Sequence, residues 1–69
     1  MKTYVIAAIN FHDNLNKIHR IKANSKEEAL LKLAGIFGFE IKSTLSIEEI
    51  QQLLFDGDMS VSDPLEIKD

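Results

Sequence analysis

The segment from Thr3 to Phe11 is apolar at nearly every position, and it constrains the fold of this chain more than any other feature. A strand that is apolar on both faces usually lies at the centre of a sheet, because both of its faces need cover. We therefore predict a central strand near the start of the chain, around which the other elements are arranged.

A hairpin is predicted to follow, because His12, Asp13 and Asn14 form a polar run in which Asp and Asn tolerate left-handed backbone. The return strand then covers residues 15–23. With a three-residue loop, Val5 lies beside Ile21 and the side chains separate onto two faces. One face holds Val5, Ala7, Ile9, Phe11, Ile21 and Ala23, and the other holds Tyr4, Ile6, Ile18, Arg20 and Lys22. A two-residue loop would exchange part of these sets.

Two capping boxes predict two helices. Ser25 precedes Glu28 by three residues, and the helix that begins there ends at Gly35 or Gly38. Ser46 precedes Glu49 in the same way, and its helix ends in the turn at residues 56–58. Apolar residues at helical spacing form one stripe on each helix: Ala29, Leu30, Leu33, Ala34 and Phe37 on the first, and Ile47, Ile50, Leu53 and Leu54 on the second.

The remaining segments complete an α+β fold of one small domain, residues 1–69. Residues 39–42 form either a short strand or an extended loop. The tail alternates again at Met59, Val61, Leu65 and Ile67, and Pro64 either places this strand at a sheet edge or breaks it. The order β-β-α-α-β predicts a three-stranded, antiparallel-rich sheet in the order 2-1-3, with both helices on one face.

The sequence contains none of the phosphate-binding, dinucleotide-binding, zinc-protease or serine-hydrolase motifs GxxxxGK(S/T), GxGxxG, HExxH and GxSxG. The chain has no cysteine, and its two histidines, His12 and His19, cannot supply the three or four ligands of a zinc site. Asp56-Gly57-Asp58 resembles the start of a calcium loop but lacks the later glycine and glutamate. We expect no cofactor, no metal and no catalytic residue, and therefore not an enzyme.

The longest apolar run, residues 5–9, falls far short of the roughly 20 residues of a membrane span. The N-terminus also lacks the apolar region and cleavage site of a signal peptide. We expect a cytoplasmic protein with no membrane partner.

Charge is distributed unevenly along the chain. Residues 1–39 hold six basic and three acidic side chains, whereas residues 40–69 hold eight acidic and two basic ones. Either this layout guides docking onto a partner, or the two halves attract each other within the fold. The acidic residues Asp56, Asp58, Asp63 and Glu66 form one candidate partner-binding patch.

The stretch Ala34-Gly35-Ile36-Phe37-Gly38-Phe39, followed by Ser43-Thr44-Leu45-Ser46, resembles the helix-turn-helix segment of phage repressors. The resemblance implies a DNA-linked regulator. Its recognition helix would offer Lys42 as a cation, with Glu40, Glu48 and Glu49 nearby, and this face would repel the phosphates that dominate DNA affinity. We therefore expect no specific binding of nucleic acid.

Met1-Lys2-Thr3-Tyr4-Val5-Ile6, and the capped helix after the hairpin, resemble small inhibitors encoded by phages and mobile elements, anti-CRISPR proteins among them. This resemblance covers residues 1–37 and implies a protein that blocks a host or defence complex by occupying its surface. The helix start Ser25-Lys26-Glu27-Glu28-Ala29-Leu30 is similar to that of small antitoxins of the HicB type, which implies an antitoxin instead.

The face of the sheet opposite the helices is the first candidate for the docking surface. The predicted register places five residues on it: Tyr4, Ile6, Ile18, Arg20 and Lys22. An aromatic residue, two isoleucines and an arginine form the composition of an interface centre, and lysine suits its rim. Alternatively, the C-terminal segment folds back over this face, or a homodimer buries it.

Overall fold

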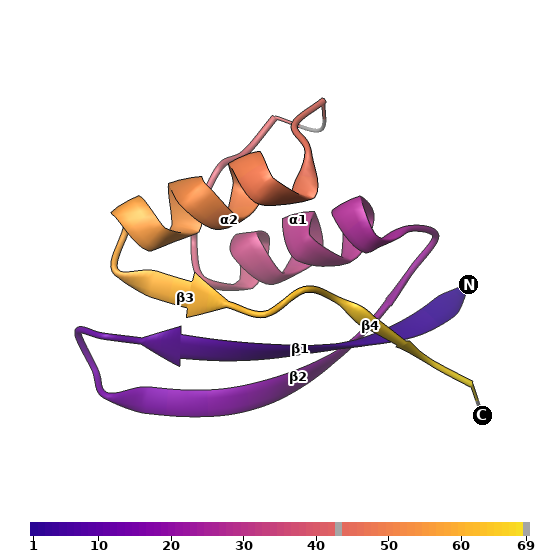
Figure 1. Cartoon of the computed structure of the whole chain (residues 1–69), viewed down its shortest axis with the longest axis horizontal. Coiled ribbons are helices and arrows are strands. Elements are labelled where there is room, and N and C mark those ends of the chain that lie inside the picture. Colours follow the sequence, from indigo (N-terminus) through magenta and orange to yellow (C-terminus); the bar gives the residue numbers. More distant parts are fainter. Residues whose placement is uncertain (43, 69) are drawn as a thin grey trace.

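The chain folds into a four-stranded antiparallel sheet with two helices on one of its faces (Figure 1). The computed structural model describes residues 1–42 and 44–68, with the backbone alone at Leu15. In chain order the elements are β1 (Lys2–Asn10), β2 (Leu15–Ala23), α1 (Lys26–Ile36), α2 (Ile47–Asp56), β3 (Met59–Val61) and β4 (Leu65–Ile67). The predicted α+β class is confirmed.

β1 lies at the centre of the sheet, as its continuous apolar sequence predicted. β2 pairs with it along one side over its whole length, whereas β3 and β4 share the other side. β3 pairs with the end of β1 around Ile9, and β4 pairs with the end around Tyr4. The predicted order 2-1-3 is therefore confirmed, with the third position divided between two short strands.

The C-terminal strand is broken between β3 and β4, so the sheet has four strands instead of the predicted three. Ser62 still holds this segment to β1. Its N–H donates to the carbonyl oxygen of Ala7 at 2.9 Å, and its Oγ accepts the N–H of Ala7 at 2.9 Å. Pro64 follows and is buried, and it has no N–H with which to continue the ladder. Both readings of Pro64 are confirmed, because the strand is broken and its two parts lie at an edge of the sheet.

The hairpin register differs from the predicted one by one residue. Asn10 pairs with Leu15, so the loop has four residues, 11–14, and Tyr4 instead of Val5 lies opposite Ile21. Because side chains alternate along a strand, this shift changes which residues of β1 share a face with which residues of β2. The predicted division of the hairpin into two faces is therefore wrong.

The side chain of Asn10 explains the longer loop. Its Oδ1 accepts the N–H of His12 at 2.9 Å and that of Asp13 at 3.4 Å, and Asn14 takes the left-handed conformation with φ 56°. Phe11, which the sequence placed in the strand, lies in the loop and contacts Phe55 edge to face, with ring centroids 6.1 Å apart.

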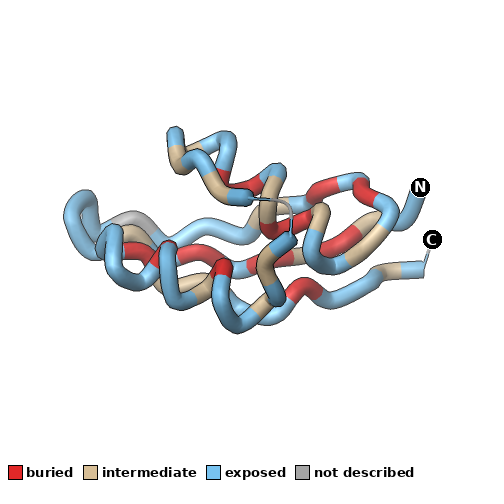
Figure 2. Tube along the Cα trace, turned by 90° about the horizontal axis from the view of Figure 1, so that it is seen from above, coloured by how far each residue is buried: buried red, intermediate tan, exposed pale blue. Residues whose placement is uncertain are grey.

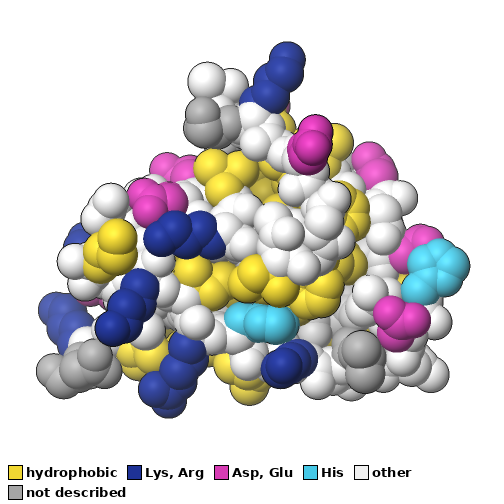
Figure 3. Space-filling view, turned by 180° about the vertical axis from the view of Figure 1, so that it is seen from behind, with side chains coloured by type: hydrophobic (Ala, Val, Ile, Leu, Met, Phe, Trp, Pro, Cys, Tyr) yellow, Lys and Arg dark blue, Asp and Glu magenta, His cyan; other side chains and the backbone are white. Residues whose placement is uncertain are grey.

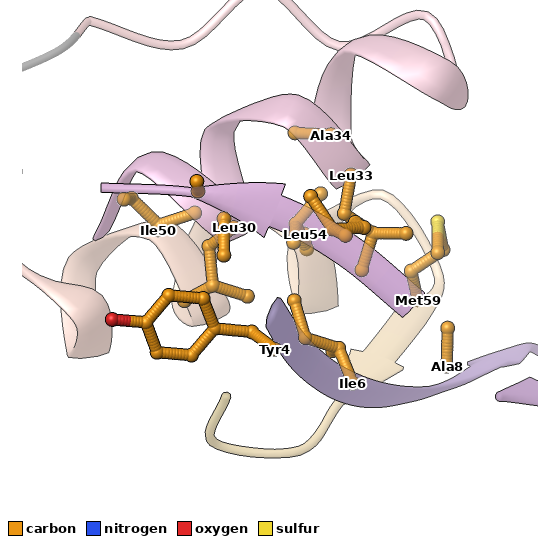
Figure 4. Close-up of a cluster of buried hydrophobic side chains, with 12 residues drawn as sticks. Tyr4, Ile6, Ala8, Leu30, Leu33, Ala34, Ile50, Leu54 and Met59 are labelled. Carbon is orange, nitrogen blue, oxygen red and sulfur yellow. The ribbon is translucent and has the colours of Figure 1, made fainter. Parts of the chain in front are cut away.

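The core lies between the sheet and the two helices (Figures 2 and 4). Tyr4 and Ile6 point into it from β1, and their side chains are 3% and 0% exposed. The prediction that placed both residues on the open face is therefore wrong, because the helices cover the other set of alternating β1 positions. The rest of the core consists of Ala8, Ile21, Ala23, Ala29, Leu30, Leu33, Ala34, Ile50, Leu54 and Met59.

α1 begins at the predicted N-cap and ends at one of the two predicted glycines, but its capping box is only half formed. The Oγ of Ser25 accepts the N–H of Glu28 at 3.1 Å, whereas the carboxylate of Glu28 lies 3.3 Å from Nζ of Lys32 instead of reaching back to Ser25. At the other end, Gly38 donates its N–H to the carbonyl of Gly35 at 3.1 Å, and Phe39 donates to Ala34 at 2.9 Å, which together form a Schellman motif. Gly38 has φ 84°, where a residue without a Cβ is favoured, so it is the correct one of the two predicted helix ends.

α2 begins at the second predicted capping box. The Oγ of Ser46 accepts the N–H of Glu49 at 3.2 Å, and Oε1 of Glu49 accepts the N–H of Ser46 at 3.1 Å. Residues 39–42 are not a strand, and the loop reading is correct: Phe39 and Ile41 pack against the core from it.

We expect Ser46→Ala to lower the free energy of unfolding by about 1 kcal/mol, because it removes the acceptor of the capping box. Ser25→Ala removes the corresponding acceptor of α1 and should have a similar effect. Urea denaturation measures both changes. Ser46→Asp is the matched control, since it keeps an acceptor at the same position and should unfold near the wild-type midpoint. Equal midpoints for the wild type and both alanine variants would contradict these helix boundaries.

Candidate protein-docking surface

The face of the sheet opposite the helices carries the side chains that alternate with the core positions. No other described element packs on it. We define the open face by Val5, Ala7, Ile9, Ile18, Arg20, Lys22, Leu65 and Ile67, which the strand register places on this side. Ile18 and Leu65 are the most exposed of its large apolar side chains, at 68% and 67%.

Three of the five residues that the sequence predicted for this surface lie on it. Ile18, Arg20 and Lys22 are exposed on β2, whereas Tyr4 and Ile6 belong to the core. Their places on β1 are taken by Val5, Ala7 and Ile9, which the predicted register places on the covered face. The signal that was missed is Asn10, whose side chain caps the turn and lengthens the loop.

Charge on the open face is positive in the part of the chain that the structure describes. Arg20 and Lys22 lie on the outer strand, opposite Val5 and Thr3 of β1. Glu66 of β4 is paired with Tyr4 and therefore shares the helix side of the sheet, not the open face. The open face thus combines an apolar centre with a basic margin along β2.

The acidic patch of the sequence analysis is spread along the opposite edge of the sheet. The carbonyl of Asp58 accepts the N–H of Phe11 at 2.9 Å beside the hairpin tip, whereas Glu66 lies beside Tyr4. Tyr4 and Phe11 are seven steps apart along the chain, which corresponds to about 24 Å of extended strand. The four carboxylates therefore do not form one compact cluster.

Each of these carboxylates has its own neighbour. Asp58 Oδ2 lies 3.2 Å from Nε2 of His12, and Glu66 Oε1 lies 3.7 Å from Nζ of Lys2. Asp63 accepts a hydrogen bond from Gln51 at 2.8 Å, and Asp56 accepts one from Gln52 at 3.1 Å. The contacts of Asp58, Asp63 and Glu66 lie beside β3 and β4, whereas that of Asp56 lies within α2.

His19 projects from β2 toward the end of α1. Its ring meets that of Phe37 edge to face, with centroids 5.5 Å apart. Its Nε2 is shielded from solvent and has no hydrogen-bond partner among the residues that the structure describes. Burial, and secondarily the charge of Lys17, lower the pKa of His19. The ring is therefore neutral at pH 7 and packs as an apolar surface. In residues 1–42 and 44–68, no three His, Asp or Glu side chains converge as metal ligands.

The N-terminal ends of the two helices form an acidic groove. It has a volume of about 830 Å³ and lies between the first turns of α1 and α2, where it is lined by Glu27, Glu28, Glu48 and Glu49. Residues 37–46 separate the two helices, whereas a helix-turn-helix motif has a turn of about three or four residues. Ser43 of the repressor-like stretch lies outside the described residues. The acidic groove and the long connection both disfavour DNA contact through α2.

No protein-family model, no curated protein and no solved structure matches this chain. Neither α1 nor α2 has the length and apolar character that crossing a membrane requires. The surface itself is therefore the basis for a functional proposal.

Proposed function

We propose that this chain is a non-catalytic protein-binding module that docks through its open face. The observation that carries the proposal is the exposure of Ile18 and Leu65, each about two thirds accessible, on a face that no other described element covers. Small proteins rarely leave a contiguous apolar face in water, and such faces mark interaction sites.

The chemistry of the open face also defines the partner. Arg20 and Lys22 lie beside the apolar centre of the open face. The surface of the partner that complements it would therefore carry apolar side chains bordered by carboxylates. Two copies docked face to face would each contribute these cations with no acid of the open face to pair with them. Complementarity therefore favours a different, acidic protein over a second copy.

The mode of action that fits this surface is inhibition by occupation. A module that covers a functional surface of a larger complex needs affinity and shape, but no catalytic group. The resemblance of residues 1–37 to inhibitors from phages and mobile elements supports a host or defence complex as the target. A HicB-like antitoxin would also bind a protein, and a captured toxin would identify that alternative.

The test measures binding of the purified partner after capture with the tagged chain. We expect Arg20→Glu with Lys22→Glu to leave the fold intact, since both side chains are exposed, and to weaken binding at least tenfold, which corresponds to about 1.4 kcal/mol. Lys26→Glu with Lys42→Glu is the matched control, because it changes the net charge equally at exposed positions outside the open face.

Two results would overturn the proposal. One is equal affinity of the wild type and the Arg20/Lys22 double variant for the captured protein. The other is a concentration-dependent dimer in analytical ultracentrifugation that Ile18→Glu abolishes, which would assign the open face to a second copy of this chain.

A further inference from the structure

β2 forms an outer edge of the sheet over all nine of its residues. An edge strand presents unpaired N–H and C=O groups that another strand can bind. β2 has β1 as its neighbour on one side, and no described strand pairs with its other side.

Hydrogen bonds on both sides of the hairpin show which groups of β2 point outward. Ala7 exchanges its hydrogen bonds with Ser62, on the side away from β2. Ile18, the register partner of Ala7, therefore turns its own N–H and C=O to the free edge. The carbonyl of Lys22 also points outward, since it accepts a hydrogen bond from Nζ of Lys32 at 2.7 Å. Both observations give the same set of outward residues: Asn16, Ile18, Arg20 and Lys22.

Charge selects what can bind along this edge. β2 carries Lys17, Arg20 and Lys22 and no acidic residue. Two copies paired through β2 would bring six cations into one ladder, and like charges on adjacent strands are destabilising. A strand that carries carboxylates would instead form cross-strand pairs with these cations. Figure 3 shows Lys and Arg side chains gathered at the lower left of the side seen from behind.

The helix side of β2 adds space for apolar side chains. A cavity of about 230 Å³ borders the strand there, lined by Ala8, Asn10, Asn16, Lys17, Phe37 and Met59. Side chains on one face of an added strand would therefore lie near this cavity and the rings of His19 and Phe37. Those on its other face would extend the open face beside Ile18.

We propose that the partner provides an acidic, extended segment that adds to β2 as a fifth strand. This inference rests on the proposed function in taking a protein as the partner, and it specifies how that protein is held. Main-chain hydrogen bonds to Asn16, Ile18 and Arg20 supply affinity, and carboxylates beside Lys17, Arg20 and Lys22 supply selectivity. The carbonyl of Lys22 already accepts a hydrogen bond from Nζ of Lys32, so the added strand would pair with β2 around Ile18.

The experiment uses the full chain labelled with ¹⁵N and a synthetic peptide of about six residues, the usual strand length, in which Glu alternates with Val. With the peptide in molar excess, we expect the amide hydrogens of Ile18 and Arg20 to exchange about tenfold more slowly. The amides of His19 and Ile21 face β1 and serve as internal controls, because their exchange should change little. A peptide with Lys in place of Glu, and one with N-methylated valines, should both fail to protect the edge.

The outcomes separate this inference from the proposed function. Leu65→Glu alters the open face at β4, which lies on the other side of β1 from β2. This variant should weaken binding of the captured partner, but the peptide should still slow amide exchange in β2 to the same extent. No protection of Ile18 and Arg20 by the acidic peptide, or equal protection by the lysine peptide, would overturn strand addition. Protection that rises with the concentration of the chain alone would show that β2 pairs with a second copy.

Discussion

Ile6→Glu is expected to unfold this protein, whereas Ala7→Glu should leave it folded. Ile6 is fully buried between the sheet and the helices, and an unpaired carboxylate there costs several kcal/mol. A domain of this size has a total stability of about 3–10 kcal/mol, so one such change is enough to unfold it. Ala7 lies on the open face, where a new carboxylate stays in water.

Circular dichroism and the dispersion of amide NMR signals measure this difference at pH 7. The pair of variants also tests the hairpin register, because neighbouring residues of β1 point to opposite sides of the sheet. If the three-residue loop applied, with the helices on the side of Val5 and Ala7, the result would be reversed. A folded Ile6→Glu together with an unfolded Ala7→Glu would therefore contradict the sheet geometry.

Leu54→Ala should lower the free energy of unfolding by about 2–5 kcal/mol, because it removes a fully buried side chain where α2 meets the core and leaves a cavity. Leu53→Ala is the matched control on the same helix. Leu53 is 44% exposed, so the same deletion should cost less than about 1 kcal/mol. Urea denaturation of both variants measures the difference, provided that the free energy of unfolding falls with urea concentration at the same slope in both.

The two leucines are neighbours in the predicted apolar stripe, and the sequence alone does not rank them. The position of α2 on the sheet buries Leu54 in the core and leaves Leu53 partly in solvent. Equal losses of stability in the two variants would show that α2 is rotated relative to the structure described above.

The features predicted correctly are those that depend on nearby residues. Ser25 and Ser46 cap helices through contacts three residues away, and Gly38 ends α1 through its own φ angle. The central position of β1 was also predicted from its continuous apolar sequence, and β1 has strand neighbours on both sides. The expected cover is present on only one of its faces, since the described helices pack on one side of the sheet.

The face of β1 that the helices cover is not determined by β1 itself, because both of its alternating sets are apolar. β2 is amphipathic, with Ile21 facing the core and Arg20 facing solvent, so β2 determines the choice through its register with β1. That register depends on one side chain, since Asn10 caps the turn and makes the loop four residues long. The open face was therefore predicted correctly on β2 and incorrectly on β1.

The four-residue hairpin loop is the place where this chain can change in length at the lowest cost, whether by natural insertion and deletion or by engineering. Residues 11–14 are exposed, and exposed loop tips tolerate added residues. A change in loop length alters the turn and leaves the two strands paired as they are, with Tyr4 opposite Ile21. A slip of the pairing by one residue is a different event, because it would place Arg20 and Lys22 against the helices. Peptide tags inserted at this tip should therefore leave the fold intact, and we expect differences in length among descendants of this sequence to gather there.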